Sequence, residues 1–514
     1  MANHLIQAKY IVANPAHREK GVLKDAGIYV YDQLIKEVGK FDELKLKYPD
    51  ATVLGSDHHI ALPGFINAHN HGQGVTTFMR GTMDDRLEIW DHYWPAKMIR
   101  SEEEAYNDTL VAVARELRSG ITSSMRHDGP AGKLDFFCKE VEAIMRGYTD
   151  AGIRFRFALS ITDQFRLVYD HDEKFISLLP AEMAELARKA AEPKECITTE
   201  EFLAYFEKLV KKYNGNARIN LAMGVIGSQW LSDKLLLLCV EKARALGIPM
   251  HGPLLETYYQ KLYSFREFGH SGGEHFHRLG VLGPDYSSAH GVWLTEEDLE
   301  YYAKIGASVT HCPSSNLRLY SGVAPVTLML DKGVNVALSV DSEGINDDED
   351  MFQEMRLAML LSRRPPMNAR SLDEWDVLAM ATTNGARPLM MENRIGRLEA
   401  GMEADIILIN LNRIMCPYMN PSIDPIIALV NRGRPDDVDY VMVAGELVYK
   451  EGKCLKFDLQ EVESKLTTIM IESYKSDRWT TDKFPVELIP YIREYFKGWK
   501  APDLDPVYIM NSKC

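Results

Sequence analysis

Short apolar runs of strand length alternate with amphipathic stretches of helical length between residue 60 and about residue 390. The runs cover 60–66, Ile121–Arg126, Ile153–Ser160, Ile219–Val225, Ile248–His251, Asp285–Ala289, Ser308–His311 and Val334–Val340. The helical stretches between them include Glu102–Arg118, Leu231–Leu246, Glu296–Ile305 and Met351–Leu361. Mostly apolar strands are typical of parallel sheets buried on both faces. Eight such β/α units in series predict an α/β fold, a (β/α)8 barrel of the TIM type.

Both ends of the chain have a different pattern, with short β-type runs separated by turn residues. The segment 1–58 is too small to bury a core of its own, so we expect it to pair with 393–456 in one small composite β-sandwich. The barrel then occupies 59–392. Residues 457–514 begin with a helical pattern over Leu459–Tyr474 and end in an aromatic tail, which we expect to pack on the body or on a second subunit.

One connection in the barrel is long. Residues 163–200 follow the third strand and include a helical Ala181–Ala191. Loops that leave the carboxyl ends of barrel strands build active sites. The segment is therefore either a lid over the site or a peripheral helical hairpin.

Composition narrows the range of partners. The net charge is −15, which disfavours nucleic acid and anionic membranes as partners. Seven scattered cysteines fit reduced thiols better than a disulfide framework. The first residues lack a signal-peptide pattern, and no apolar run approaches the roughly 20 residues of a membrane span. We expect a cytoplasmic protein, a homo-oligomer, that acts on a small molecule.

Histidine and acidic residues stand at or just beyond the predicted strand ends, where barrel enzymes place their chemistry. They are His69, His71, His127, His251, Glu256, His290, His311 and Asp341. His69 and His71 are separated by one residue. Because side chains alternate along a strand, these two imidazoles share a face and could hold one metal ion.

Four motifs carry a resemblance to a known family. They are Leu62-Pro-Gly-Phe-Ile-Asn-Ala-His-Asn-His, Ala289-His-Gly-Val-Trp-Leu-Thr, Thr310-His-Cys-Pro-Ser-Ser-Asn-Leu-Arg-Leu and Leu338-Ser-Val-Asp-Ser. In sequence and order they resemble the amidohydrolase superfamily, in its triazine hydrolase and cytosine/guanine deaminase-like branch. The resemblance implies a mononuclear metal site with His69, His71, His290 and Asp341 as ligands. It also implies that Glu256 is the acid of strand five and that His311 contacts the reacting group.

Strand five departs from the family pattern His-x-x-Glu-Thr, in which the histidine is a ligand. Pro253 occupies that position, and His251 lies two residues earlier. Either a bulge at Gly252-Pro253 lifts His251 to the metal, as we predict, or the site lacks this ligand. The thiocarbamate and phenylurea hydrolases of this branch are similar in having an atypical ligand set.

The types of residue at the strand ends indicate which reaction the site could perform. A divalent ion held by imidazoles lowers the pKa of bound water from about 15.7 to about 7. Asp341 could accept a proton from that water, Glu256 could protonate the leaving nitrogen, and His311 could stabilise developing charge. The run after strand four contains no lysine to bridge two metals, so we expect one ion per chain, zinc first, with iron, manganese or cobalt as alternatives.

Four further residues are predicted substrate contacts from their positions: His127, Gln229, Trp90 and Arg80. The leading hypothesis is a metal-dependent hydrolase that attacks a carbon–nitrogen bond. It would deaminate an N-heterocycle or cleave an amide, urea or carbamate-like bond. The alternative is a non-catalytic barrel that has lost a ligand and serves in binding or assembly.

Overall fold

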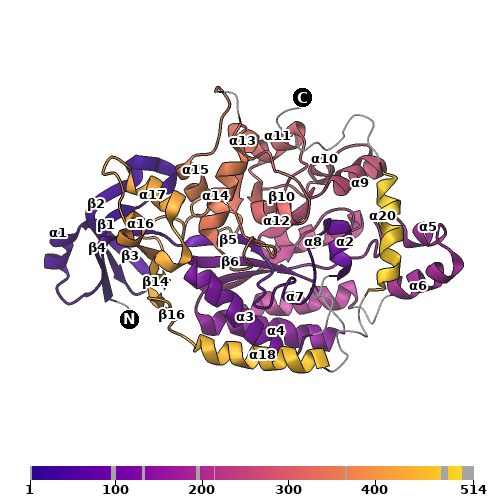
Figure 1. The fold of residues 1–514 in the computed structure, drawn as a ribbon, viewed down its shortest axis with the longest axis horizontal. Coiled ribbons are helices and arrows are strands. Elements are labelled where there is room, and N and C mark those ends of the chain that lie inside the picture. Colours follow the sequence, from indigo (N-terminus) through magenta and orange to yellow (C-terminus); the bar gives the residue numbers. More distant parts are fainter. Residues whose placement is uncertain are drawn as a thin grey trace.

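The computed structural model describes residues 3–93, 100–129, 133–192, 197–213, 215–364, 367–475 and 484–499. Two eight-stranded sheets organise these residues (Figure 1). One sheet forms the barrel in the middle of the view. The other lies at one end, where β1–β4 and β14 are labelled beside the amino terminus.

The barrel strands follow one another in chain order and pair in parallel. They are β5 (Phe65–Asn70), β6 (Ile121–Asp128), β7 (Arg154–Leu159), β8 (Ile219–Gly224), β9 (Met250–Leu254), β10 (Tyr286–His290), β11 (Ser308–His311) and β12 (Asn335–Leu338). The last strand returns to the first, because the backbone N–H of Asp341 donates to the carbonyl of His69 at 3.1 Å. The predicted (β/α)8 barrel is confirmed.

The first barrel strand begins later than predicted. The apolar run 60–66 is divided between β4 (Thr52–Pro63), which belongs to the other sheet, and β5. The division falls at Gly64, whose missing side chain makes room for Thr122: a Cβ there would lie 2.1 Å from the Thr122 hydroxyl oxygen. A run of buried residues can serve two sheets in succession, and apolar periodicity alone does not mark the break.

The second sheet is built from both chain ends, as predicted, in the order β16-β15-β14-β13-β4-β1-β2-β3. Its other strands are β1 (Asn3–Val12), β2 (Val22–Tyr31), β3 (Leu34–Lys40), β13 (Ile406–Asn410), β14 (Val438–Val443), β15 (Glu446–Lys450) and β16 (Lys453–Cys454). β4 is the junction, because it pairs with β1 from the amino-terminal end and with β13 from the carboxyl-terminal end. It also runs across the predicted boundary between residues 58 and 59.

Helices follow the barrel strands and cover the outside of the barrel, and other helices connect strands of the second sheet or pack on them. In the first half of the chain they are η1 (Pro15–Gly21), α1 (Phe41–Lys47), α2 (Leu87–Tyr93), α3 (Glu102–Arg118), α4 (Leu134–Ala151), α5 (Asp172–Ile176), α6 (Ala181–Ala191), α7 (Thr199–Tyr213) and α8 (Asp233–Leu246). In the second half they are α9 (Tyr258–Phe268), α10 (Gly272–Arg278), α11 (Glu296–Ile305), α12 (Pro313–Arg318), α13 (Val326–Asp331), α14 (Met351–Leu361), α15 (Glu374–Met380), α16 (Leu411–Met415), α17 (Pro425–Arg432), η3 (Pro435–Asp437), α18 (Leu459–Lys475), η4 (Val486–Leu488) and α20 (Ile489–Lys497). Among the described helices, none is both long and apolar enough to span a membrane.

Local sequence explains where these helices begin and end. The side chain of Ser232 accepts a hydrogen bond from the backbone N–H of Leu235 at the start of α8, which satisfies one of the free donors of the first turn. The same helix ends at Gly247, which adopts a left-handed φ of 65°. At α11, Thr295 and Asp298 form a reciprocal capping box.

The carboxyl-terminal helix α20 packs at the barrel mouth against the long connection that follows β7. Ile489, Ile492 and Phe496 of α20 belong to one buried cluster with Tyr169 and Phe175 of that connection. Figure 1 shows α20 beside α5, α6, α9 and α2, at the end of the molecule opposite the second sheet. The helices of the insertion therefore pack against α20, and its role as a lid over the site stays a prediction.

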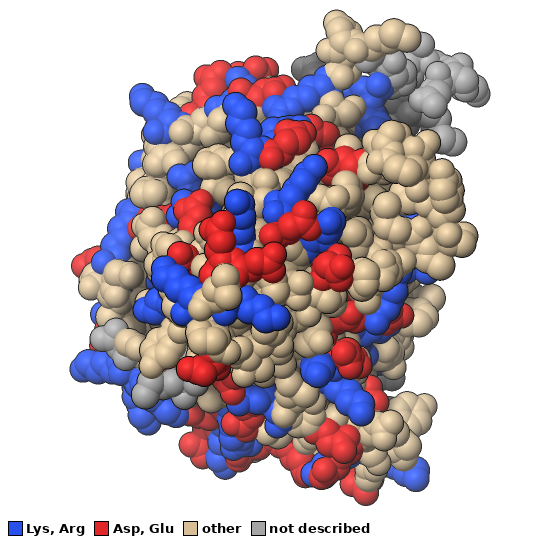
Figure 2. Space-filling model, turned by 90° about the vertical axis from the view of Figure 1, so that its left-hand side faces the viewer, with Lys and Arg blue, Asp and Glu red and all other residues tan. Residues whose placement is uncertain are grey.

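Charges are interspersed on the end of the molecule formed by the second sheet. Figure 2 shows Lys and Arg side chains alternating there with Asp and Glu side chains. Several of them form exposed ion pairs, such as Lys9 Nζ with Asp25 Oδ1 at 2.6 Å and Arg118 Nη2 with Asp436 Oδ1 at 2.7 Å. Exposed pairs of this kind contribute only about 0–1 kcal/mol each.

A buried ion pair joins the barrel to the second sheet. The guanidinium of Arg154, at the start of β7, donates to both carboxylate oxygens of Asp405 at 2.9 and 2.8 Å. Asp405 precedes β13, and its carboxylate also accepts from the backbone N–H of Ala444 at 2.8 Å. Arg154 is 1% exposed and Asp405 is 3% exposed, so water cannot replace either partner.

We expect Asp405→Ala to lower the free energy of unfolding by about 3–5 kcal/mol, because it leaves the Arg154 charge buried with an incomplete set of partners. The matched control, Asp436→Ala, removes the exposed partner of Arg118 and should cost about 0–1 kcal/mol. Urea unfolding followed by circular dichroism measures both values. Equal losses in the two variants would contradict a special role for the buried pair.

Candidate active site

Three buried side chains from distant parts of the chain meet at the carboxyl end of the barrel. His69 of β5, His290 of β10 and Asp341, just after β12, each place one donor atom within 4.8 Å of those of the other two. The distance from His69 Nε2 to Asp341 Oδ1 is 3.6 Å, and that from His290 Nε2 to Asp341 Oδ2 is 3.7 Å. His71 Nε2 lies 3.5 Å from Asp341 Oδ1. Asp341 is thus central to a group of three imidazoles.

The ladder of β5 is irregular next to His69 and to His71, which follows the strand. The pairing between β5 and β6 shifts register between Asn67 and Asn70. The amides of these two asparagines donate to the carboxylate of Glu116 on α3, at 3.2 and 2.7 Å. The rings of His69 and His71 are consequently free to converge, with their centroids 5.3 Å apart.

The backbone is strained at two of the three meeting points. His290 has φ 69° and Asp341 has φ 64°, which is the left-handed region that residues with a side chain avoid. Such a conformation costs of order 1–3 kcal/mol and persists where surrounding contacts impose it. At both residues it coincides with the carboxyl end of a strand and with a side chain directed to the common centre.

A buried carboxylic acid lies beside this centre. Glu256 is 3% exposed, and burial raises its pKa to about 7. Its Oε2 atom lies 3.5 Å from His290 Nε2, and Ser321 donates to its Oε1 atom at 3.2 Å. His290 is itself fixed from behind, because its Nδ1–H donates to the side-chain oxygen of Asn316 at 2.9 Å. Glu256 can therefore donate or accept a proton next to the histidines.

A second buried acid, Glu88 of α2, also lies close to Glu256. Burial raises the pKa of Glu88 to about 7, and its carboxylate accepts a hydrogen bond from Thr257. The sequence pattern does not distinguish Glu88 from the other acids in the connection after β5. Asn316 could have been noted, since it belongs to the motif that contains His311.

His251 is buried, and both of its ring nitrogens have partners. Its Nε2 atom lies 2.8 Å from His69 Nδ1, and its Nδ1 atom lies 2.7 Å from the Ser287 hydroxyl. The pairing of β9 with β10 runs without a shift from Met250 to Leu254, so the bulge predicted at Gly252-Pro253 is not found in this ladder. The role of His251 as a ligand stays a prediction.

The predicted substrate contacts lie in different surroundings. His127 of β6 is buried, with its ring centroid 5.9 Å from that of His69. Gln229, which follows β8, is 2% exposed, and its Nε2 atom is buried without a hydrogen-bond partner. Trp90 packs with Leu87 and Leu319 in a small cluster at the mouth. The contacts of these three with a substrate stay predictions.

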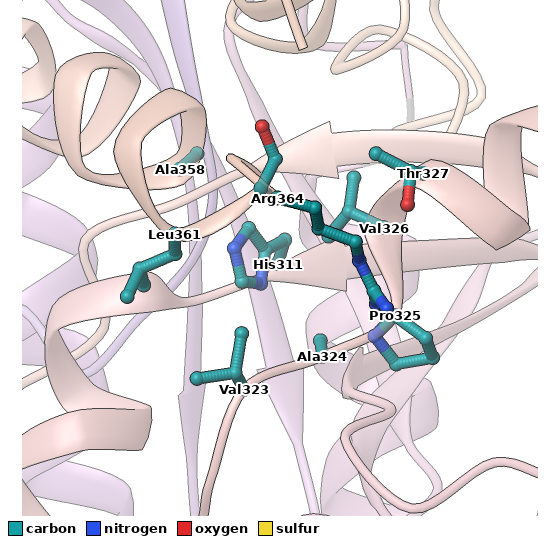
Figure 3. Close-up of a pocket in the computed structure, with 10 residues that line it drawn as sticks. His311, Val323, Ala324, Pro325, Val326, Thr327, Ala358, Leu361 and Arg364 are labelled. Carbon is teal, nitrogen blue, oxygen red and sulfur yellow. The ribbon is translucent and has the colours of Figure 1, made fainter. Parts of the chain in front are cut away.

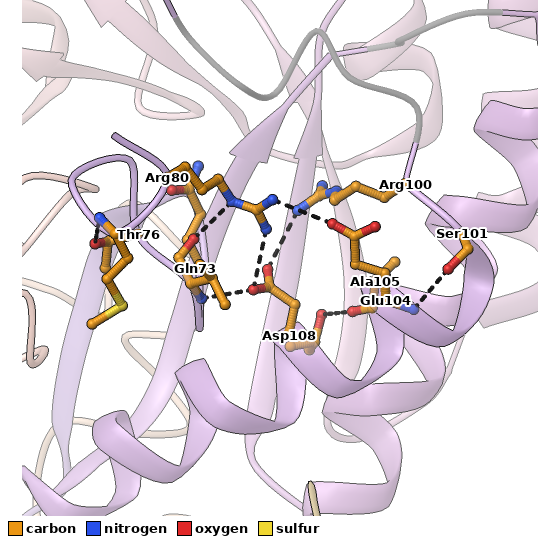
Figure 4. Close-up of polar contacts among 12 residues, drawn as sticks. Gln73, Thr76, Arg80, Arg100, Ser101, Glu104, Ala105 and Asp108 are labelled. Atoms are coloured by element: carbon orange, nitrogen blue, oxygen red, sulfur yellow. Dashed lines mark hydrogen bonds and ion pairs between the residues drawn. The ribbon is translucent and has the colours of Figure 1, made fainter. Parts of the chain in front are cut away.

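Arg80 is engaged elsewhere. Its side chain, 5% exposed, lies 3.2 Å from the carboxylate of Glu104 and 3.6 Å from that of Asp108, both on α3 (Figure 4). Its Nε–H donates to the carbonyl of Val75 at 3.0 Å. Arg100 joins the same network through Asp108, at 3.4 Å. These bonds hold the loop after β5 against α3; a substrate contact of Arg80 stays a prediction.

His311 separates the site from a small cavity. Burial, and then the charge of His290, lower its pKa to about 3, so the ring is neutral. On its other side lies a cavity of about 140 Å³ whose lining includes Val323, Ala324 and Arg364 (Figure 3). The Nδ1 atom of His311 is buried without a hydrogen-bond partner and is available to a bound molecule.

The donor set suits a divalent cation. Imidazole nitrogens and one carboxylate are ligands for zinc, iron, manganese and cobalt. Burial lowers the pKa of His69 well below its usual range and also lowers that of His71, which leaves neutral rings with a lone pair to donate. His69 Nε2 is buried without a hydrogen-bond partner, as expected of an atom that faces a cation.

Proteins of similar sequence are deaminases. The chain is 29% identical to a 5'-deoxyadenosine deaminase of Methanosarcina mazei, over 90% of this chain and 96% of that protein. It is 30% identical to a 5-methylthioadenosine/S-adenosylhomocysteine deaminase of Caldanaerobacter subterraneus subsp. tengcongensis, over 86% of this chain and 93% of that protein.

Solved structures with the same fold include a zinc-bound adenosine deaminase of Xanthomonas campestris, with a TM-score of 0.77 and 25% identity over 92% of this chain and 99% of that one. Atrazine chlorohydrolase of Arthrobacter aurescens TC1, also with zinc, has a TM-score of 0.77 and 20% identity, with 91% and 99% of the two chains covered. Residues 60–448 match the model of the amidohydrolase family. The barrel, the site at its mouth and this match together show that the chain belongs to the amidohydrolase family.

Proposed function

We propose that this protein is a metal-dependent hydrolase that replaces a carbon–nitrogen bond of a small molecule by a carbon–oxygen bond. The observation that carries the proposal is the convergence of His69, His290 and Asp341 at the barrel mouth, with donor atoms within 4.8 Å of one another. His71 adds a third imidazole, 3.5 Å from the same carboxylate. A divalent ion there, zinc by analogy with the zinc-bound relatives, would make water nucleophilic at neutral pH.

Asp341 and Glu256 each carry out one of the two proton transfers. Asp341 accepts the proton of the attacking water, because its carboxylate faces the centre from the eighth strand. Burial raises the pKa of Glu256 to about 7, so its protonated form is populated at neutral pH and delivers a proton to the departing nitrogen; the C–N bond breaks after water has added to the carbon. His311, neutral and buried, hydrogen-bonds to the oxygen or nitrogen on which charge develops.

The favoured reaction is deamination of an adenine-type nucleoside, since the relatives named above act on 5'-deoxyadenosine, methylthioadenosine or S-adenosylhomocysteine. A second candidate, cleavage of an amide, urea or carbamate-like bond, is favoured by one observation. Pro253 stands where the family pattern has a ligand, so the site differs from that of a typical deaminase.

We expect the zinc-loaded protein to release ammonia from at least one member of a panel of adenine nucleosides. Ammonia is measured by a coupled dehydrogenase assay, and the keto product by chromatography. A parallel panel of ureas, anilides and carbamates, scored for amine release, tests the second candidate. Failure in both panels by protein that carries one metal per chain would contradict the hydrolase proposal and favour the binding or assembly alternative.

We expect Glu256→Gln to lower kcat by about 10²–10⁴-fold, because the amide is similar in size but cannot transfer the proton. Metal content, measured by elemental analysis, should stay at the wild-type value. Glu241→Gln, an exposed carboxylate on α8, serves as the control and should leave kcat unchanged. A kcat for Glu256→Gln within twofold of wild type would remove Glu256 from the mechanism.

We expect Asn316→Ala to weaken metal binding by about 10–100-fold, because it removes the acceptor that holds the His290 ring. Competition with a chromogenic chelator measures this change. Asn316→Asp keeps an acceptor oxygen and should retain most of the affinity, and Asn346→Ala on the exposed surface is the matched control. Unchanged affinity in Asn316→Ala would show that His290 needs no such support.

A further inference from the structure

Strand β9 offers no donor at the position where the family pattern has a ligand. Pro253 fills that position, and its side chain carries no nitrogen or oxygen. His251 lies two residues earlier on the same face of the strand. Its neighbours on both sides are in regular register, since it pairs with Ser287 of β10 and with Gly224 of β8. The backbone therefore does not advance His251 toward the mouth.

The hydrogen bonds of His251 also place it behind a ligand. The contacts of its ring can be made in two arrangements of protons, because the Ser287 hydroxyl can donate or accept. In one of them, His69 Nδ1–H donates to His251 Nε2 at 2.8 Å and His251 Nδ1–H donates to the Ser287 hydroxyl at 2.7 Å. This arrangement leaves the lone pair of His69 on Nε2, the atom that faces Asp341 at 3.6 Å. Ligating histidines usually have such a partner on the ring nitrogen that does not bind the metal.

His127 has the opposite properties. It is 7% exposed, and neither of its ring nitrogens has a hydrogen-bond partner among the described residues. Leaving one buried polar group unsatisfied costs about 1–3 kcal/mol, so two on one ring call for an explanation. An imidazole nitrogen with a free lone pair is what a metal ion binds.

The ring of His127 lies next to the rings of the two histidines at the end of the first barrel strand. Its ring centroid lies 5.9 Å from that of His69 and 5.8 Å from that of His71. Two imidazoles that bind one ion at about 2.0–2.1 Å have ring centres roughly 5–6 Å apart. His127 also reaches across toward β9, with 6.5 Å between its ring and that of His251. The strands between β6 and β9 place small side chains in the barrel interior there, those of Ala158 and Ala222.

We propose that His127 of β6 supplies the metal-binding imidazole that position 253 lacks, and that His251 is a positioning residue that orients His69. The proposal rests on the metal-dependent function proposed above. The ligand it concerns is a divalent cation of the zinc and cobalt class. It gives His127 a role different from the substrate contact expected from the sequence.

The test uses the full-length protein loaded with Co²⁺, whose visible absorption reports the number and type of ligands. Metal affinity is measured by chelator competition. In His127→Ala we expect the absorption band to change and the affinity to fall by more than the roughly 10–100-fold that loss of an outer hydrogen-bond partner costs. In His251→Gln we expect a loss within that range and an unchanged band. His58→Ala, an exposed histidine, is the control and should match wild type.

A rescue variant makes the test specific. In His127→Ala/Pro253→His, an imidazole returns to strand five, so we expect most of the lost affinity and a band close to that of wild type to return. If His127→Ala does not fold by circular dichroism, His127→Gln, which keeps a side chain of similar length, replaces it in both comparisons.

Three results would overturn the inference. Wild-type affinity and an unchanged band in His127→Ala would exclude His127 as a ligand, and a raised KM in that variant would return it to the substrate pocket. A changed band in His251→Gln would identify His251 as the ligand instead. If the double variant did not regain affinity, His127 would not be the replacement for a ligand at position 253. Failure of the wild-type protein itself to bind a metal would instead contradict the proposed function.

Discussion

Closure of the barrel between its first and last strands is the constraint on which the site depends. The backbone N–H of Asp341 donates to the carbonyl of His69, and the N–H of Val340 donates to the side-chain oxygen of Asn67 at 3.0 Å. The amide of Asn67 is held in turn by Glu116 and Glu349, at 3.2 and 3.3 Å. Residues 273 positions apart are thereby fixed against each other. Without this seam, the carboxylate and the imidazoles of the site would have no common centre.

The buried acids and strained residues along this seam cost free energy of folding, as is common at functional sites. Burial raises the pKa of Glu116 to about 7 and that of Glu349 well above its usual range, so these acids are kept close to neutrality behind β5. His290 and Asp341 have strained backbones. Buried acids, the neutral imidazoles of His69, His71 and His311, and left-handed residues gather at one end of the barrel, whereas the opposite end is tied down by the pair of Arg154 and Asp405. Stability and chemistry therefore occupy different ends of one fold.

The chain departs from the family pattern above all in strand five. Deaminases of the family are similar over most of this chain, yet position 253 is a proline. The loss of one donor does not dismantle a site whose other donors come from separate strands. It leaves His251 free to support His69, and it leaves room for an imidazole from another strand.

The sequence by itself determined the barrel, the composite second sheet and the strand-end positions of His69, His71, His290, His311 and Asp341. These features follow from local periodicity, because alternation along a strand decides which residues share a face. Only the tertiary structure decided which donor atoms meet, that His251 contacts His69, that Arg80 binds Glu104, and that Asn316 and Glu88 flank the site. The division at Gly64 between two sheets was also invisible in the apolar pattern. Periodicity specifies the direction of a side chain, whereas distances across a closed barrel depend on register, bulges and packing between strands that are far apart in the chain.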